Sequence, residues 1–322
     1  MASFRITPPT DYLLHRDVCS YGYFVLAPNV WVPGQVAGDT GTFCRIFDLG
    51  GIAVRAEVTQ PCLPAQPGKP CRPATPRAHR GMPLRITTAR PISGLARAQL
   101  RAALTRMLRL DESAETIAHF HKLDPRWRRR GQGRLLRSPT LFEDIIKTVT
   151  SCNVAWSSTK RMNTRLCEVY GIGGAFPQPA TLAAARPAHM RASCGVGYRD
   201  VRIVELAKRF AKDDTLKDTL EDATLSDAHL REVLIELPGI GPYAASNILQ
   251  LLGRYGQLPL DTEAVRHGRT VLGLRGNSRT VMKRVGRHFA KFKDQQFRSY
   301  WFEMWTGYEA LRGPAHKRGW GG

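Results

Sequence analysis

The segment Leu237-Pro238-Gly239-Ile240-Gly241-Pro242-Tyr243-Ala244-Ala245 decides the fold of this chain. Pro238 ends one helix, Gly239 and Gly241 permit tight backbone conformations that a side chain would obstruct, and Pro242 suits the first turn of the next helix. Ile240 is an apolar plug between the two helices. The exposed N–H groups of such a turn form an anion site that fits a phosphate of DNA. We therefore expect a helix-hairpin-helix over 237–245, in which Gly239 and Gly241 bind the DNA backbone without reading bases. A turn with no ligand is the alternative.

The charge of the chain points to an anionic partner. Its 322 residues include 48 Lys and Arg but 27 Asp and Glu, which gives a net charge of +21. Such a surplus repels itself unless an anion neutralises it, and nucleic acid is the usual partner, with an acidic membrane surface as the alternative. No apolar run is long enough to span a membrane, and the first residues lack the apolar stretch of a signal peptide. We expect a cytoplasmic, nucleoid-associated monomer that binds double-stranded DNA and no membrane.

The seven cysteines are scattered, and no two of them form a Cys-x-x-Cys pair. This pattern fits reduced thiols and argues against a zinc site or an iron–sulfur cluster, which need closely spaced thiolates. No metal bound by side chains and no cofactor are expected. The backbone carbonyls of the hairpin could hold a monovalent cation.

The pattern of apolar residues predicts an α+β protein with a small antiparallel β domain, residues 1–93, followed by an all-helical domain, residues 94–322. Aromatic and β-branched residues predict strands at 21–32, 42–49, 52–58 and 82–88, and Gly50-Gly51 predicts a hairpin turn. Between the last two strands, prolines recur at every third position over 61–76, which favours a stiff exposed loop over a docking site for a proline-binding domain.

After residue 92 the apolar residues recur at three- and four-residue spacing, which is typical of helices. The predicted helices are 96–108, 138–152, 157–170, 199–212, 227–237, 242–252 and 262–272.

An aspartate follows the second helix of the hairpin. Asp261 comes after the apolar, Pro-containing turn Gly256-Gln257-Leu258-Pro259-Leu260. This arrangement resembles the helix-hairpin-helix DNA glycosylase superfamily, in which an Asp occupies that place. The resemblance implies that Asp261 is the catalytic residue, because a carboxylate stabilises the positive charge that develops on the sugar when an N-glycosidic bond breaks. The alternative, that Asp261 caps the helix over 262–272, is compatible with catalysis.

Tyr243 lies where bifunctional members of the superfamily carry a nucleophilic lysine. A phenol cannot form a Schiff base with the sugar, so the resemblance implies release of the base without strand cleavage. In 3-methyladenine DNA glycosylase II the same position is aromatic and would stack on an alkylated base. Asn247, one turn later, and Trp301 are predicted to line the same base pocket. Helix packing is the alternative for Tyr243 and Trp301.

Other segments resemble 8-oxoguanine DNA glycosylase. Thr150-Ser151-Cys152-Asn153 and Gly195-Val196-Gly197-Tyr198-Arg199 are similar to two of its motifs. The position of that family's second partner-base arginine is Ser158 here. The resemblance implies that Tyr198 fills the gap left by a flipped base, while Asn153 and Arg199 hold the partner base. A buried loop tyrosine, a helix-capping asparagine and a phosphate-binding arginine are the alternatives.

The densest basic run, Arg126-Trp127-Arg128-Arg129-Arg130 with Arg134 and Arg137, is expected near DNA phosphates, or else to form a solvated loop.

Three functions remain open from the sequence. The leading one is a monofunctional DNA glycosylase that removes a damaged or modified base from duplex DNA, with alkylated purines favoured. The second is a non-catalytic helix-hairpin-helix DNA-binding protein, which would have no need of Asp261. The third is a glycosylase/lyase for oxidised purines that uses a relocated amine such as Lys147 or Lys160.

Overall fold

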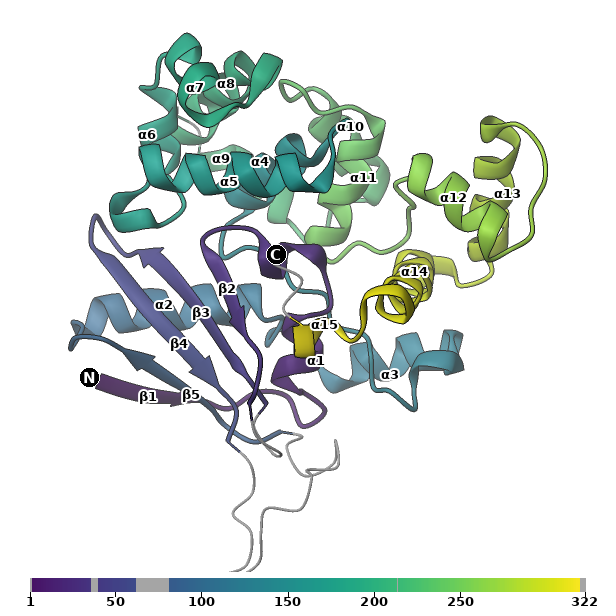
Figure 1. The fold of residues 1–322 in the computed structure, drawn as a ribbon, viewed down its shortest axis with the longest axis horizontal. Coiled ribbons are helices and arrows are strands. Elements are labelled where there is room, and N and C mark those ends of the chain that lie inside the picture. Colours follow the sequence, from purple (N-terminus) through teal and green to yellow (C-terminus); the bar gives the residue numbers. More distant parts are fainter. Residues whose placement is uncertain (1, 36–39, 62–80, 213, 319–322) are drawn as a thin grey trace, which may run out of the picture.

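The computed structural model describes residues 2–35, 40–61, 81–212 and 214–318. An antiparallel sheet of five strands lies at one side of the molecule, and helices form the rest (Figure 1). The predicted α+β class is therefore confirmed. The Pro-rich segment over 61–76 lies, beyond Pro61, outside the described residues.

The sheet has the strand order β1-β5-β4-β3-β2. Its strands are β1 (Ala2–Ile6), β2 (Asn29–Val32), β3 (Thr42–Asp48), β4 (Ala53–Thr59) and β5 (Leu84–Thr88). Between β3 and β4, Gly50 and Gly51 have φ values of 67° and 86°, which residues with a Cβ rarely adopt. The hairpin predicted from Gly50-Gly51 is thus confirmed, whereas β1 was not foreseen.

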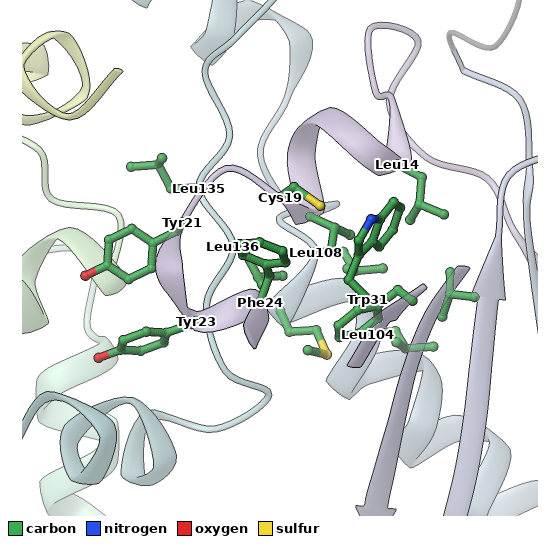
Figure 2. Packing of buried hydrophobic residues seen from close by; sticks show 14 of the residues in the cluster. Leu14, Cys19, Tyr21, Tyr23, Phe24, Trp31, Leu104, Leu108, Leu135 and Leu136 are labelled. Carbon is green, nitrogen blue, oxygen red and sulfur yellow. The ribbon is translucent and has the colours of Figure 1, made fainter. Parts of the chain in front are cut away.

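The strand predicted over 21–32 is wrong for most of its length. Gly22–Val25 is a 3-10 helix, η1, and only Asn29–Val32 forms a strand. Tyr21 and Tyr23 point to one side of η1 while Phe24 points into the core beside Cys19 (Figure 2). Aromatic residues are enriched in strands because they pack well on half-buried surfaces, and here the same packing is achieved by a turn.

The helices account for most of the chain. They are α1 (Leu14–Val18), α2 (Gly94–Met107), α3 (Ala114–Leu123), α4 (Leu141–Ser151), α5 (Trp156–Tyr170), α6 (Pro179–Ala183), α7 (Pro187–Cys194), α8 (Asp200–Lys212), α9 (Asp214–Glu221), α10 (Asp227–Ile235), α11 (Pro242–Leu251), α12 (Thr262–Thr270), α13 (Ser278–Ala290), α14 (Gln296–Arg312) and α15 (Ala315–Arg318). All seven predicted helices are present within a few residues of their expected ends. None of the helices in the described ranges is both long and apolar enough to cross a membrane.

Three hydrophobic clusters organise the described residues. The first joins the sheet and α2 to α14, through residues such as Phe43, Leu104 and Phe302. The second lies inside the helical body formed by α4 to α11. The third is small and connects α12 and α13 to α14 through Val281, Phe289 and others. Consequently α12 and α13 form a lobe that lies apart from the helical body (Figure 1).

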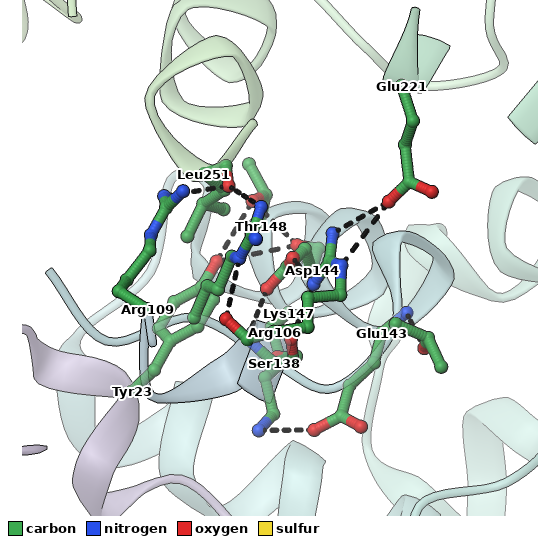
Figure 3. A network of polar contacts seen from close by, with 12 residues as sticks. Tyr23, Arg106, Arg109, Ser138, Glu143, Asp144, Lys147, Thr148, Glu221 and Leu251 are labelled. Atoms are coloured by element: carbon green, nitrogen blue, oxygen red, sulfur yellow. Dashed lines mark hydrogen bonds and ion pairs between the residues drawn. The ribbon is translucent and has the colours of Figure 1, made fainter. Parts of the chain in front are cut away.

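Helix α4 is buried along almost its whole length and carries charged side chains into the interior. Arg45 of β3 donates two hydrogen bonds to Glu143, at 2.9 and 2.6 Å, and the Lys147 Nζ lies 2.7 Å from the same carboxylate. Arg106 of α2 pairs with Asp144 at 2.8 Å (Figure 3). Because every one of these charges has an opposite charge beside it, the network can be buried.

Two arginines bind the backbone carbonyls at the C-terminal end of α11. The Arg109 Nη2 donates to the carbonyls of Gln250 and Leu251 at 2.9 and 2.8 Å, and the Arg137 Nη1 donates to that of Leu251 at 3.2 Å. Figure 3 shows the first of these arginines reaching Leu251. The last carbonyls of a helix have no partner within it, so these guanidinium groups cap α11 at its C-terminus.

Candidate active site

A cleft of about 1680 Å³ separates the helical body from α12 and α14. Its lining includes all nine residues that the sequence predicts for the site: Asn153, Tyr198, Arg199, Gly239, Gly241, Tyr243, Asn247, Asp261 and Trp301. The fold therefore brings together residues that lie as far apart as 153 and 301. A cleft of this size exceeds the roughly 300–1,000 Å³ of small-molecule pockets and can take an extended ligand.

The hairpin between α10 and α11 forms one edge of the cleft. Gly239 has a φ of +79°, and a Cβ at this position would lie 2.7 Å from the Cδ of Arg202, so a glycine is needed there. Ile240 is buried as a plug, and its N–H donates to the Leu237 carbonyl at 3.1 Å.

The prediction that a side chain at Gly241 would obstruct its backbone conformation is wrong. Its φ of −95° and ψ of −179° are extended values that any residue adopts, and a Cβ there would meet nothing within 4 Å. Gly241 is the N-cap residue of α11, and having no side chain it forms no capping hydrogen bond to the first N–H groups of the helix. The N–H groups of the first turn of α11 are consequently available to an anion in the cleft.

Asp261 both caps a helix and lines the cleft. Its Oδ1 accepts a hydrogen bond from the Ala264 N–H at 3.0 Å, at the start of α12. Burial raises the pKa of the Asp261 carboxyl, against which the Ala264 N–H and the Tyr243 hydroxyl, as donors to the carboxylate, act to lower it. A half-buried carboxylate that is held by two donors has a fixed position and an incompletely compensated charge.

Tyr243, in the first turn of α11, connects the hairpin to Asp261. Burial raises the pKa of its phenol, and the negative charge of Asp261 raises it further. The Tyr243 hydroxyl is therefore a neutral donor to that carboxylate. Asn247, one turn along α11, is nearly buried, and its Nδ2 donates to the Tyr243 carbonyl at 3.3 Å.

Trp301 of α14 belongs to a series of aromatic rings in the wall of the cleft. Its ring centroid lies 4.7 Å from that of Tyr21 and 5.6 Å from that of Trp305, and its indole N–H donates to the Ser20 carbonyl at 2.8 Å. The alternative of core packing is thus true of one face of Trp301, which also lines the cleft.

Tyr21 is a wall residue that sequence reasoning missed. It was assigned to a strand, and nothing in a single sequence indicates that the turn at η1 directs it toward α11. Its ring centroid lies 4.9 Å from that of Tyr23, whose hydroxyl lies 2.9 Å from the Thr148 Oγ1 of α4. Burial raises the pKa of the Tyr21 phenol. Together Tyr21, Tyr243 and Trp301 contribute aromatic surface to the lining of the cleft that contains Asp261.

Two exposed residues, Tyr198 and Asn153, also line the cleft. Tyr198 has 53% of its surface exposed although it is a large aromatic residue. Asn153, just after α4, is exposed and has a φ of +53°, in the left-handed region that asparagine tolerates better than most residues. Both side chains are accessible to a ligand in the cleft.

Arg199 is buried, and its guanidinium group is already engaged. Its Nε donates to the Val149 carbonyl at 3.1 Å and its Nη2 to the Cys152 carbonyl, so that it caps the end of α4. Its guanidinium carbon also lies 4.5 Å from the ring centroid of Tyr198. Arg202, which sequence reasoning missed, is exposed and lies 5.0 Å from the same centroid.

No lysine lines the cleft among the described residues. Lys147, one of the two candidate amines, is fully buried between Glu143 and the rings of Tyr23 and Phe176. Lys160, the other, does not contribute to the lining either.

The basic run at 126–130 does not line the cleft. Arg126 pairs with Asp124 and Glu303, whereas Arg134 and Arg137 are buried and pair with Asp11 and Asp111. The expectation that Arg134 and Arg137 contact DNA phosphates is therefore wrong, because acidic partners distant in sequence neutralise them inside the protein.

Within the described ranges, no group of three or more His, Cys, Asp and Glu side chains is placed to hold a metal ion. The five cysteines in those ranges are free thiols.

No protein-family model matches the sequence, and none of the curated proteins is similar to it in sequence. Solved structures do match it. An apo-form 8-oxoguanine glycosylase/lyase from Clostridium acetobutylicum has a TM-score of 0.65 and 16% identity, covering 95% of this chain and 96% of that one. A 3-methyladenine DNA glycosylase from Archaeoglobus fulgidus has a TM-score of 0.63 and 18% identity, covering 96% and 99%.

The Clostridium enzyme in complex with double-stranded DNA containing cytosine opposite 8-oxoguanine gives a TM-score of 0.60 and 16% identity, over 95% of this chain and 99% of that one. Such likeness at low identity extends over almost the whole length of each protein. The chain thus has the fold of the helix-hairpin-helix DNA glycosylases, its sheet and its helical body included.

Proposed function

We propose that this protein is a monofunctional DNA glycosylase that removes a damaged base from duplex DNA, with an alkylated purine as its preferred target. The observation that carries the proposal is the position of Asp261 in an aromatic cleft next to the hairpin. Coverage of almost the full length of two glycosylase structures supports it at the level of fold.

Asp261 is suited to stabilising a cation. Cleavage of an N-glycosidic bond leaves positive charge on the sugar, and a carboxylate held close to that sugar lowers the energy of the transition state. The Ala264 N–H and the Tyr243 hydroxyl favour the ionised carboxylate and so oppose the rise in its pKa that burial causes. In a half-buried site the attraction is stronger than in water. The same carboxylate can orient the attacking water.

The hairpin and the two exposed residues supply the binding. The first turn of α11 takes a backbone phosphate, which brings the sugar of the flipped nucleotide toward Asp261. Tyr198 fills the space that the base leaves in the stack, with Asn153 beside it to contact the partner base. Arg199 supports Tyr198 through its ring face and fixes the end of α4.

The preference for an alkylated purine follows from the wall of the cleft. Tyr21, Tyr243 and Trp301 present aromatic faces, and a base that carries a positive charge after alkylation is attracted to such faces by about 0.5–2 kcal/mol. The absence of a lysine from the described lining supports base release without strand cleavage.

The test is a panel of duplexes that contain 3-methyladenine, hypoxanthine, uracil or 8-oxoguanine, each followed for base release and then treated with alkali. We expect release to be fastest from the alkylated duplex and strand breaks to form only after alkali. Strand breaks before alkali, together with a protein–DNA adduct trapped by borohydride, would instead establish the glycosylase/lyase alternative. Binding without release from any duplex would establish the non-catalytic one.

A further inference from the structure

Residues 262–293, here called the basic lobe, comprise α12, the turn after it, α13 and the three residues that follow. This lobe has nine cationic side chains and one acidic one, Glu263. The cations are Arg266, Arg269, Arg275, Arg279, Lys283, Arg284, Arg287, Lys291 and Lys293. The lobe therefore holds a large share of the net charge of +21 in about a tenth of the chain.

These nine cations are exposed, and almost none of them is neutralised. Within the described part of the protein, the ion pair of Arg266 with Glu263, at 2.8 Å, is the one that they form with an acid. Arg126 differs from these cations in having two acidic partners, Asp124 and Glu303. The charge of the basic lobe is left for a partner outside the molecule.

On α13 the cations are arranged as a ladder. Arg279, Lys283, Arg287 and Lys291 follow one another at four-residue spacing, so that each lies one turn above the last. Like charges at this spacing repel and destabilise a helix. The opposite face of α13 carries the buried residues of the third cluster, such as Val285. The core of the lobe thus fixes the ladder toward solvent.

The ladder begins beside the cleft. Met282 of α13 and Arg266 of α12 both line the cleft, and α12 itself starts at the cap formed by Asp261. At about 100° per residue, Arg279 lies roughly 60° around the helix from Met282, and Lys283 roughly 100°. The cationic surface is consequently continuous with the wall of the cleft.

We propose that the basic lobe binds the phosphate backbone of the same duplex outside the nucleotide held in the cleft. From Arg279 to Lys291 the ladder spans about 18 Å at 1.5 Å per residue, which corresponds to roughly five base pairs of duplex. The proposal rests on the proposed function only in taking duplex DNA as the partner. It makes the bound segment of DNA longer than the cleft alone requires, and it makes this lobe a main source of salt dependence.

The test compares two triple variants of equal charge. Lys283→Gln, Arg287→Gln and Lys291→Gln remove three steps of the ladder, whereas Lys208→Gln, Arg209→Gln and Lys212→Gln remove three exposed cations at the end of α8, which do not line the cleft. Binding of undamaged duplexes of 10 and 40 base pairs is measured by fluorescence anisotropy over a series of salt concentrations. Undamaged DNA keeps this measurement independent of whether any base is released.

The ladder variant is expected to bind the 40-base-pair duplex at least about tenfold more weakly, with a salt slope reduced by about 2 to 3, while the α8 variant stays close to the unaltered protein. On the 10-base-pair duplex the two variants should bind alike. The ladder variant should unfold at an equal or higher temperature, since repulsion along α13 is relieved. Equal weakening by both variants, or an unchanged salt slope in the ladder variant, would overturn the proposal.

Discussion

Glu143 on α4 and Asp261 in the cleft are two carboxylates whose surroundings differ in the charges beside them. On α4, Glu143 lies between Arg45 and Lys147, and although burial acts to raise its pKa, these two cations bring the pKa of Glu143 below its usual value. In the cleft, Asp261 forms no ion pair within the described residues, and burial raises its pKa. The first carboxylate has two cations of the protein beside it, whereas the second has no cation paired with it among the described residues. The difference separates a structural acid from a candidate catalytic one.

The largest expected effect is a loss of stability when Glu143, the carboxylate paired with two cations, is replaced. Glu143→Gln leaves Arg45 and Lys147 charged and buried without a counter-charge, which should lower the free energy of unfolding by about 3–5 kcal/mol. Urea denaturation at neutral pH measures this loss. The protein that remains folded should release base at the normal rate, because Glu143 does not line the cleft. A stability within 1 kcal/mol of the unaltered protein would contradict the assignment of Glu143 as the centre of the network.

A smaller effect, on activity alone, is expected from Asp261→Asn. The rate of base release should fall by about 10²–10³-fold, because the amide cannot stabilise a developing cation as a carboxylate does. Asparagine accepts a hydrogen bond from the Ala264 N–H as aspartate does, so α12 keeps its cap and the protein its stability. Glu263→Gln is the matched control, since Glu263 pairs with Arg266 and accepts a hydrogen bond from Tyr308 at 2.7 Å. If both substitutions slowed release equally, Asp261 would have no special role.

The smallest effect is expected from Tyr243→Phe, which removes one donor from Asp261. A hydrogen bond to a charged group is worth about 1.5 kcal/mol or more, so the rate should fall roughly tenfold. The pH dependence sharpens the comparison. Release should increase with pH as Asp261 loses its proton, at a midpoint above the ordinary value for aspartate, and loss of the phenol should move this midpoint upward. A midpoint that did not move would show that the Tyr243 hydroxyl does not stabilise the Asp261 carboxylate and that Tyr243 contacts the base instead.

Local patterns in the sequence were enough for part of this site. Pro and Gly in the hairpin, and apolar spacing in α4, α5 and α11, act over a few residues and so can be read from one chain. The assignment of Asp261 and Tyr243 to one site came from the resemblance to the glycosylase superfamily.

Other features depend on contacts between distant segments. The charge run at Arg134 and Arg137 suggested a DNA surface because its acidic partners lie elsewhere in the chain, Asp111 26 residues from Arg137 and Asp11 123 residues from Arg134. Tyr21 reaches the cleft because the 3-10 helix η1 follows it. The aromatic residues around it predicted a strand there instead. Likewise, the sequence contains the cations of the basic lobe, but only the structure shows that they are exposed and that Arg266 alone among them pairs with an acid in the described residues.

The capping of α11 by Arg109 and Arg137 has a consequence for the field around the hairpin. A helix carries roughly half a positive charge at its N-terminus and half a negative charge at its C-terminus. Two guanidinium groups at the carbonyls of Gln250 and Leu251 cancel the negative pole. The positive pole at Gly241 then acts as a monopole, whose attraction for a phosphate decays more slowly with distance than that of a dipole. Outside the protein, the field of α11 is therefore mainly that of its positive N-terminal end, because its negative C-terminal end is neutralised inside.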